Sequence, residues 1–191
     1  MVLHIFTEEA SFKLMTDYIV PQLLPEGVNF RVYTHQGKQD LEKALESTVP
    51  RISRMPGSRI LITRDKDTAD CRHLKNKLLK LIEEKCQCPY LVRIICHELE
   101  CWYLGDLQAI KAAYPRFAPD KHINSSVFRN VDNIQNAPEK ILNIVPELNK
   151  REYLPKLEFS RKVAAHLSVK RNTSTSFRHF VSAVKRLTAI A

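Results

Sequence analysis

Four short runs of apolar and β-branched residues, separated by longer stretches with helical spacing, fill the first part of the chain. The runs are Val2 to Phe6, Phe30 to Tyr33, Arg59 to Thr63 and Tyr90 to Cys96, and their composition is typical of β-strands. In the stretches between them, apolar residues recur on one helical face, as Phe12, Met15 and Ile19 do. Parallel neighbouring strands need such crossover connections. The order therefore predicts an α/β fold with a mainly parallel four-stranded sheet flanked by helices.

The chain after residue 106 has a different character, because its patterns are helical except in residues 115–136, which are polar and irregular and which we expect to form a loop. The clearest is the last one, in which Phe177, Phe180 and Val184 form an apolar stripe that Ser174 or Ser176 can cap. We therefore expect an α/β core in residues 1–106 and a helical, basic C-terminal extension in residues 107–191 that packs on this core.

The net charge of the chain is +9, and most of the excess lies near the C-terminus. Residues 150–191 contain ten basic and two acidic side chains. Because a basic surface attracts polyanions, nucleic acid is the first partner to expect, although an acidic protein would use the same surface.

Composition excludes several other classes of protein. No stretch approaches the roughly 20 apolar residues of a membrane-spanning helix, and the N-terminus lacks the features of a signal peptide. We therefore expect a cytoplasmic protein without a membrane partner. Only 4 glycines are present, which excludes most glycine-rich phosphate-binding loops.

Acidic residues follow three of the four predicted strands. They are Glu8 and Glu9 after the first, Asp65 and Asp67 after the third, and Glu98 and Glu100 after the fourth. Since the carboxyl ends of parallel strands meet at one edge, we expect these acids to converge there. Clustered carboxylates repel one another unless a cation neutralises them, and Mg²⁺ or Mn²⁺ suits carboxylate oxygen. In an extended strand end, Asp65 and Asp67 would point the same way and could share one ion or hold two. Glu8 would complete the ligand shell or act as a general acid or base.

The same acids have plainer structural interpretations. An aspartate after a strand often caps the next helix, as Asp70 or Thr68 would do for the helix that begins near Cys71. Glu98 and Glu100 share a face only if the strand continues through them. If a helix has begun by His97, they diverge by about 200°.

A resemblance to known proteins rests on these residues. A strand followed by a glutamate, with D-x-D two strands later in a parallel sheet, resembles the Toprim domain of topoisomerases, primases and nucleases of the overcoming-lysogenisation-defect type. The runs "THQGKQDLEKAL", "ITRDKDTADCRHLKNKL", "CHELECWYLGDL" and "NTSTSFRHF" resemble a bacterial family of unknown function that is similar to the RloB-like proteins of restriction-associated loci. The resemblance implies a Toprim-like sheet and metal site, often in defence systems and beside an ATPase partner.

By position, the resemblance assigns Glu8 to the Toprim glutamate and Asp65 with Asp67 to its D-x-D motif. Glu100, in "LECW", matches an acid before a tryptophan in the RloB-like pattern. Glu9 departs from the Toprim pattern, in which a glycine commonly follows the glutamate.

These observations predict a magnesium- or manganese-dependent nuclease, or a related phosphoryl-transfer enzyme, that acts on nucleic acid in a defence system. The expected catalytic and metal-binding residues are Glu8, Asp65, Asp67 and Glu100, and the expected phosphate or nucleic-acid contacts are Lys38, Arg64, His97, Arg178 and Lys185. The alternative is a non-catalytic binding or regulatory module that docks an ATPase partner or nucleic acid through its basic helices. A small-molecule phosphotransfer enzyme is a third alternative, because no motif in the chain is typical of base recognition.

Overall fold

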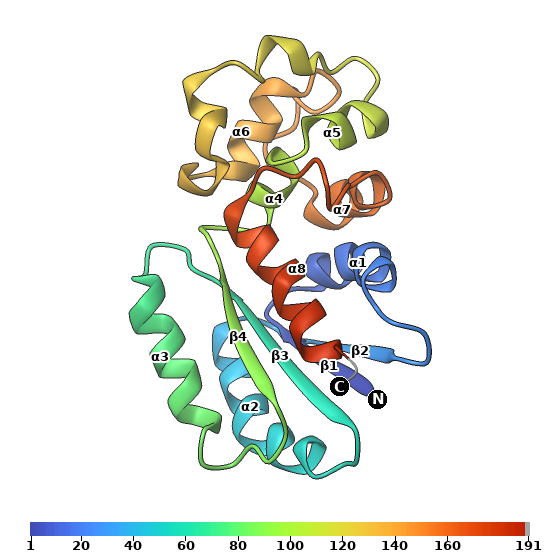
Figure 1. The fold of residues 1–191 in the computed structure, drawn as a ribbon. Coiled ribbons are helices and arrows are strands. Elements are labelled where there is room, and N and C mark those ends of the chain that lie inside the picture. The colour runs from blue at the N-terminus through green and yellow to red at the C-terminus, as the bar shows by residue number, and fades with distance from the viewer. Residues whose placement is uncertain (190–191) are drawn as a thin grey trace.

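The computed structural model describes residues 1–189 and contains one four-stranded, all-parallel sheet. The strands are β1 (Val2–Thr7), β2 (Asn29–Thr34), β3 (Ser58–Asp65) and β4 (Tyr90–Ile95). Their order across the sheet is β2-β1-β3-β4, so β4 is an edge strand (Figure 1). Helices flank this sheet and make up the C-terminal part, which confirms the predicted α/β class and is consistent with a Toprim-like arrangement.

Helices cover both faces of the sheet (Figure 1). The first crossover contains α1 (Ala10–Ile19) and the short 3₁₀ helix η1 (Val20–Gln22), and the next two contain α2 (Lys38–Ser53) and α3 (Cys71–Ile82). After β4 the chain forms α4 (Glu100–Leu104), α5 (Leu107–Ala113), the 3₁₀ helices η2 (Pro119–Lys121) and η3 (Ser126–Asn133), and then α6 (Ala137–Ile144), α7 (Lys156–Ala164) and α8 (Thr175–Thr188). The segment expected to be a loop, residues 115–136, thus contains two 3₁₀ helices.

Alternate residues of the central strands enter two separate hydrophobic cores, because successive side chains of a strand point to opposite faces. Phe6 and Ile62 pack with α2 and α3 in the smaller core. Leu3 and Leu61 belong to the larger core, which also contains apolar residues of α1 and of every α-helix from α4 to α8. The larger core therefore includes residues on both sides of position 106, and the boundary expected there stays a prediction.

Two local features of the sequence have the expected roles. Asp70 caps α3 by accepting a hydrogen bond from the backbone N–H of His73, and Ser174 caps α8 by accepting one from Phe177. The fourth strand differs from what its nearly continuous apolar run predicts, since such runs are typical of strands that are buried on both faces. Four of the six residues of β4 are only partly buried, since an edge strand has a neighbour on one side only.

Among the helices of residues 1–189, none has the length and apolar character that a membrane crossing requires.

Candidate functional site

Carboxylates from three adjacent strand ends gather around one lysine at the carboxyl edge of the sheet. Lys156, the first residue of α7, places its Nζ atom 3.4 Å from a carboxylate oxygen of each of Glu9, Glu98 and Glu100. Glu9 precedes α1, Glu98 lies between β4 and α4, and Glu100 begins α4. With Asp65, at the end of β3, and Glu8, after β1, these side chains form what we call the acid centre: Glu8, Glu9, Asp65, Glu98, Glu100 and Lys156.

Glu100 is the most deeply buried member of the acid centre. Its side chain has no exposed surface, and neither carboxylate oxygen has a hydrogen-bond partner among the described residues. Burial raises the pKa of Glu100 to about 7, against the opposing attraction of Lys156. A carboxyl group with this pKa exchanges its proton near neutral pH, which is unusual for a glutamate.

Asp65 occupies a similar environment. It is the last residue of β3 and is 7% exposed. Burial, followed by the negative charges of Glu9 and Glu100, raises the pKa of Asp65 well above its usual value. The acid centre therefore holds more negative charge than its single ammonium group can neutralise.

Glu8 is the member of the acid centre that also lies beside Arg64. Its Oε2 atom is buried without a hydrogen-bond partner and lies 3.9 Å from the Nε atom of Arg64. Burial and then the charge of Asp67 raise the pKa of Glu8, whereas Arg64 and Lys38 lower it. Glu8 is thus a partly buried carboxyl group whose acidic neighbours are Asp67 and Glu9.

The structure corrects the expectation that Asp65 and Asp67 lie on one extended strand end. The strand stops at Asp65, and Asp67 adopts a left-handed backbone conformation with φ 50°. His97 also has a left-handed conformation, with φ 56°. Two contacts join the turns: the Asp67 N–H donates to the His97 carbonyl at 3.0 Å, and Nδ1 of the His97 ring lies 3.1 Å from the Asp67 carbonyl oxygen. The two aspartates therefore do not share a face.

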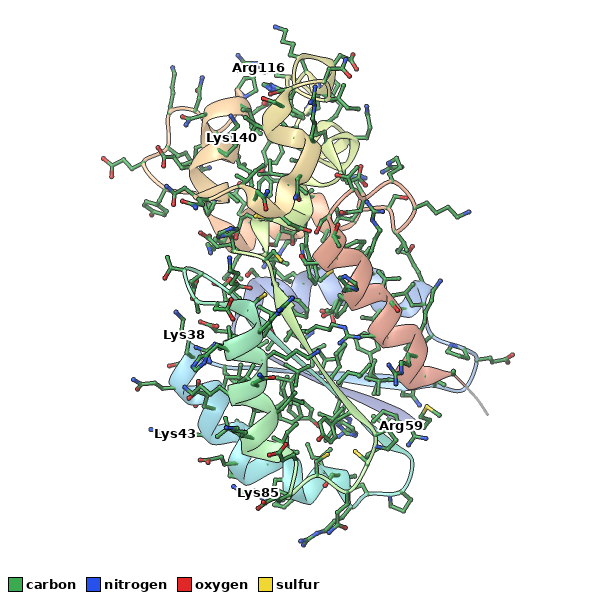
Figure 2. All side chains as sticks on the ribbon, turned by 60° about the vertical axis from the view of Figure 1, so that its left-hand side comes forward. Lys38, Lys43, Arg59, Lys85, Arg116 and Lys140 are labelled. Atoms are coloured by element: carbon green, nitrogen blue, oxygen red, sulfur yellow. The ribbon has the colours of Figure 1, made fainter. Side chains whose placement is uncertain are left out.

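Asp67 instead forms an ion pair with Lys38 at the start of α2. Figure 2 shows Lys38 at this end of the helix, where its side chain is exposed. Asp67, His97 and Glu98 help to line a cavity of about 290 Å³ next to the acid centre. Asp67, Lys38 and His97 therefore lie at an opening beside the buried carboxylates.

The other expected phosphate contacts are placed differently. Arg64 is buried and donates through Nη1 to Glu42 of α2, which also pairs with Lys77. Arg178 donates to the carbonyl of Thr173 at 2.7 Å. Lys185 lies in the last turn of α8, near the N-terminal ends of the strands and so far from the acid centre (Figure 1).

Glu98 and Glu100 fit neither of the two expected arrangements, a strand that continues through them or a helix that has begun by His97. The strand ends at Ile95 and the helix begins at Glu100, with the left-handed turn of His97 between them. This turn brings both carboxylates to Lys156. No pattern in the sequence pointed to Lys156, because its partners lie up to 147 positions away and no local motif surrounds it.

Whether the acid centre fits a divalent cation can be judged from its atoms. Within residues 1–189, no three histidine, cysteine or acidic side chains already stand together as a metal-ligand set. The donors are nevertheless all carboxylates, as a hard cation prefers, and both oxygens of Glu100 and Oε2 of Glu8 lack hydrogen-bond partners. The chemistry of the residues therefore fits Mg²⁺ or Mn²⁺, with the Lys156 ammonium now at the point where three of the carboxylates meet.

Comparison with known proteins gives one match. The model of a protein family described as "Domain of unknown function (DUF4276)" matches residues 7–185, which is nearly the whole chain. No curated protein and no solved structure matches the chain.

Proposed function

The chain belongs to the DUF4276 family, and we propose that it is a magnesium- or manganese-dependent nuclease, or a related phosphoryl-transfer enzyme, that acts on nucleic acid. The observation that carries the proposal is the excess of buried carboxylates in the acid centre. The proposal also includes a relationship to the Toprim and RloB-like proteins that the sequence resembles.

The charge balance is the first argument. The acid centre contains five carboxyl groups and one ammonium group, with Arg64 beside Glu8. Asp65 and Glu100 have raised pKa values because they are buried among other acids. Such an arrangement costs folding free energy, and perturbed carboxyl groups of this kind are concentrated in functional sites. A divalent cation bound here would neutralise the carboxylates and draw phosphate oxygens to itself.

The positions of the acids are the second argument. Glu8 directly follows β1 and Asp65 ends β3, which are the positions that the Toprim resemblance assigns to the glutamate and the first aspartate. Ligands of open parallel sheets bind outside the carboxyl ends of the strands, and the acid centre lies at this edge.

The residues then take distinct roles. Asp65 and Glu100 hold the cation, and Glu8, whose pKa is raised, serves as a ligand or as a general acid or base. Asp67 lies at the opening, where Lys38 and His97 are placed to contact phosphate. Lys156 holds the carboxylates together in the free protein, and its ammonium group is suited to contact a phosphate oxygen.

The partner class follows from the charge of the chain. The net charge of +9 favours a polyanionic substrate. Action in the cytoplasm, in a defence system and beside an ATPase partner, completes the proposal and rests on the family resemblance.

Cleavage of labelled single- and double-stranded DNA and RNA, with Mg²⁺ and with Mn²⁺, tests the proposal. We expect metal-dependent cleavage that Asp65→Asn lowers by at least about 100-fold, because this change removes a buried charge that faces the cation. The matched control is Asp17→Asn, which alters an exposed aspartate paired with Lys13 on α1. A wild-type protein that cuts none of the substrates with either metal would contradict the proposal and favour the non-catalytic docking module.

A further inference from the structure

The edge strand β4 exposes unpaired backbone groups. Ile60 donates to the Pro89 carbonyl and Lys66 to the Ile95 carbonyl, so the odd-numbered residues of this strand direct their backbone groups toward β3. The N–H and C=O groups of Val92 and Ile94 consequently point outward. Among residues 1–189 only the Val92 carbonyl has a partner there, because Arg93 of the same strand donates to it at 3.0 Å.

This open edge forms the floor of a groove between two helices. We call it the β4-edge groove, and its volume is about 510 Å³. Its lining consists of Cys71, Arg72 and Lys75 of α3, Val92, Arg93, Ile94 and Cys96 of the β4 segment, Asp132, and Thr175, Ser176 and His179 of α8. Figure 1 shows β4 running between these two helices. At the end of the strand, Ser176 closes the groove by accepting a hydrogen bond from the Cys96 N–H at 3.5 Å.

The groove is positively charged. Arg72 and Lys75 lie on one wall and Arg93 on the floor, and none of the three forms an ion pair with a carboxylate within residues 1–189. Arg186 of α8 adds further positive charge near Arg93.

The one acid in the lining offsets only part of this charge, and its oxygens already have hydrogen-bond partners. Asp132 is buried and accepts hydrogen bonds from the Ser174 and Ser176 hydroxyls and from the Ser176 N–H. The groove therefore offers a ligand three cationic side chains without a carboxylate partner, of which Arg93 also donates to the carbonyls of Val92 and His179, against one carboxylate whose oxygens are already hydrogen-bonded.

We propose that the β4-edge groove binds an extended acidic segment of a partner protein, which adds to the sheet as a further strand beside β4. This inference goes beyond the proposed nuclease function and does not depend on it. A peptide backbone supplies both donors and acceptors, so it can pair with the Ile94 N–H and C=O and with the Val92 N–H. Its acidic side chains would then face Arg72, Lys75 and Arg93.

A nucleic acid strand fits the same groove less well. The sugar-phosphate backbone of DNA supplies acceptors only, so the outward carbonyl of Ile94 would stay unpaired, and RNA adds only its 2′-hydroxyl as a backbone donor. The only ring in the lining is that of His179, whereas proteins that hold single strands stack bases on aromatic side chains. Basic residues on an edge strand also repel a second copy of the same edge. The charge of the groove therefore favours an acidic strand over a second β4.

Amide hydrogen exchange measured by NMR tests the proposal, with a short peptide of alternating valine and glutamate as the probe. In the free protein the amides of Val92 and Ile94 should exchange quickly, whereas the Arg93 amide, which faces β3, should be protected. Millimolar peptide at low salt should slow exchange at Val92 and Ile94 and leave Arg93 unchanged. An absence of added protection at these two amides would overturn the proposal.

Charge-reversal variants and other probes test the chemistry of the ligand. The double variant Arg72→Glu/Lys75→Glu should weaken binding of the labelled peptide by about tenfold or more, as expected for two lost charge pairs. Lys43→Glu is the matched control, since Lys43 extends from α2 into solvent (Figure 2). Equal binding of a valine–lysine peptide would overturn the proposal. So would protection of Val92 and Ile94 by oligothymidylate in place of the peptide, which would assign the groove to nucleic acid.

Discussion

At the scale of single residues, Glu100 shows most directly how the acid centre lowers the free energy of unfolding. A buried carboxylate without a hydrogen bond is costly in a folded protein, and here the nearest cation is 3.4 Å away and shared with two other glutamates. Burial raises the pKa of Glu100 to about 7 because the neutral form is favoured in this environment. The residue therefore links the folding free energy of the protein to pH.

The substitution Glu100→Gln should change this pH dependence. Because the pKa is raised from 4.5 to about 7, the folded state binds the proton more tightly, and this contribution to stability is lost as pH rises through that range. The stability of the glutamine variant relative to wild type should therefore increase by roughly 3 kcal/mol over the same range.

Urea unfolding at several pH values, in the presence of a chelator, measures the effect. Glu84→Gln serves as the control, because Glu84 is exposed and lies outside the acid centre. If the stability of Glu100→Gln followed pH in parallel with that of wild type, the account of Glu100 would be wrong.

At the scale of elements, the sequence was informative wherever the structure depends on local pattern. The four strands and the crossover helices were predicted because composition and apolar spacing are local properties, and the topology then placed the acids of β1, β3 and β4 at one edge. Asp67 was predicted wrongly as part of an extended strand end. Its left-handed turn is held by His97, thirty positions away, and no local pattern reports such a contact.

The start of α8 offers a test at this scale. The Ser174 hydroxyl accepts a hydrogen bond from the Phe177 N–H at 3.0 Å and donates one to Asp132 at 2.6 Å, and the residue is fully buried. Ser174→Ala should lower the free energy of unfolding by about 2 kcal/mol, because it leaves a buried N–H and a buried carboxylate oxygen with fewer partners.

Asp70→Ala provides the comparison for Ser174→Ala, since Asp70 caps α3 through the same type of hydrogen bond but is exposed to water. Water can replace the lost partner there, so the expected loss is smaller. Urea unfolding of both variants measures the two losses of unfolding free energy. An equal or smaller loss for Ser174→Ala would show that its buried hydrogen bonds contribute no additional stability.

At the scale of the whole molecule, the acid centre forms where the edge of the sheet meets the C-terminal helices. The strand ends supply the carboxylates, whereas α7 supplies Lys156, which contacts Glu9 and Glu98 in the β1–α1 and β4–α4 connections and Glu100 at the start of α4. The acids could be predicted from the topology of a parallel sheet. The cation could not, because its position depends on the packing of α7 against α1, which are far apart in the chain.

This arrangement gives the helical part a role in the site itself. One continuous core joins the helices to the sheet, so the lysine is held by the same packing that stabilises the fold. The central claim is that this centre, with its unbalanced negative charge, binds a divalent cation.

Isothermal titration calorimetry with Mg²⁺ and Mn²⁺ tests that claim most directly, with wild type, Asp65→Asn/Glu100→Gln and the Asp17→Asn control. The account predicts saturable binding by wild type and by Asp17→Asn, and its loss in the double variant while the far-UV circular dichroism spectrum is unchanged. A wild-type protein that binds neither ion, or a folded double variant that binds as wild type does, would contradict it.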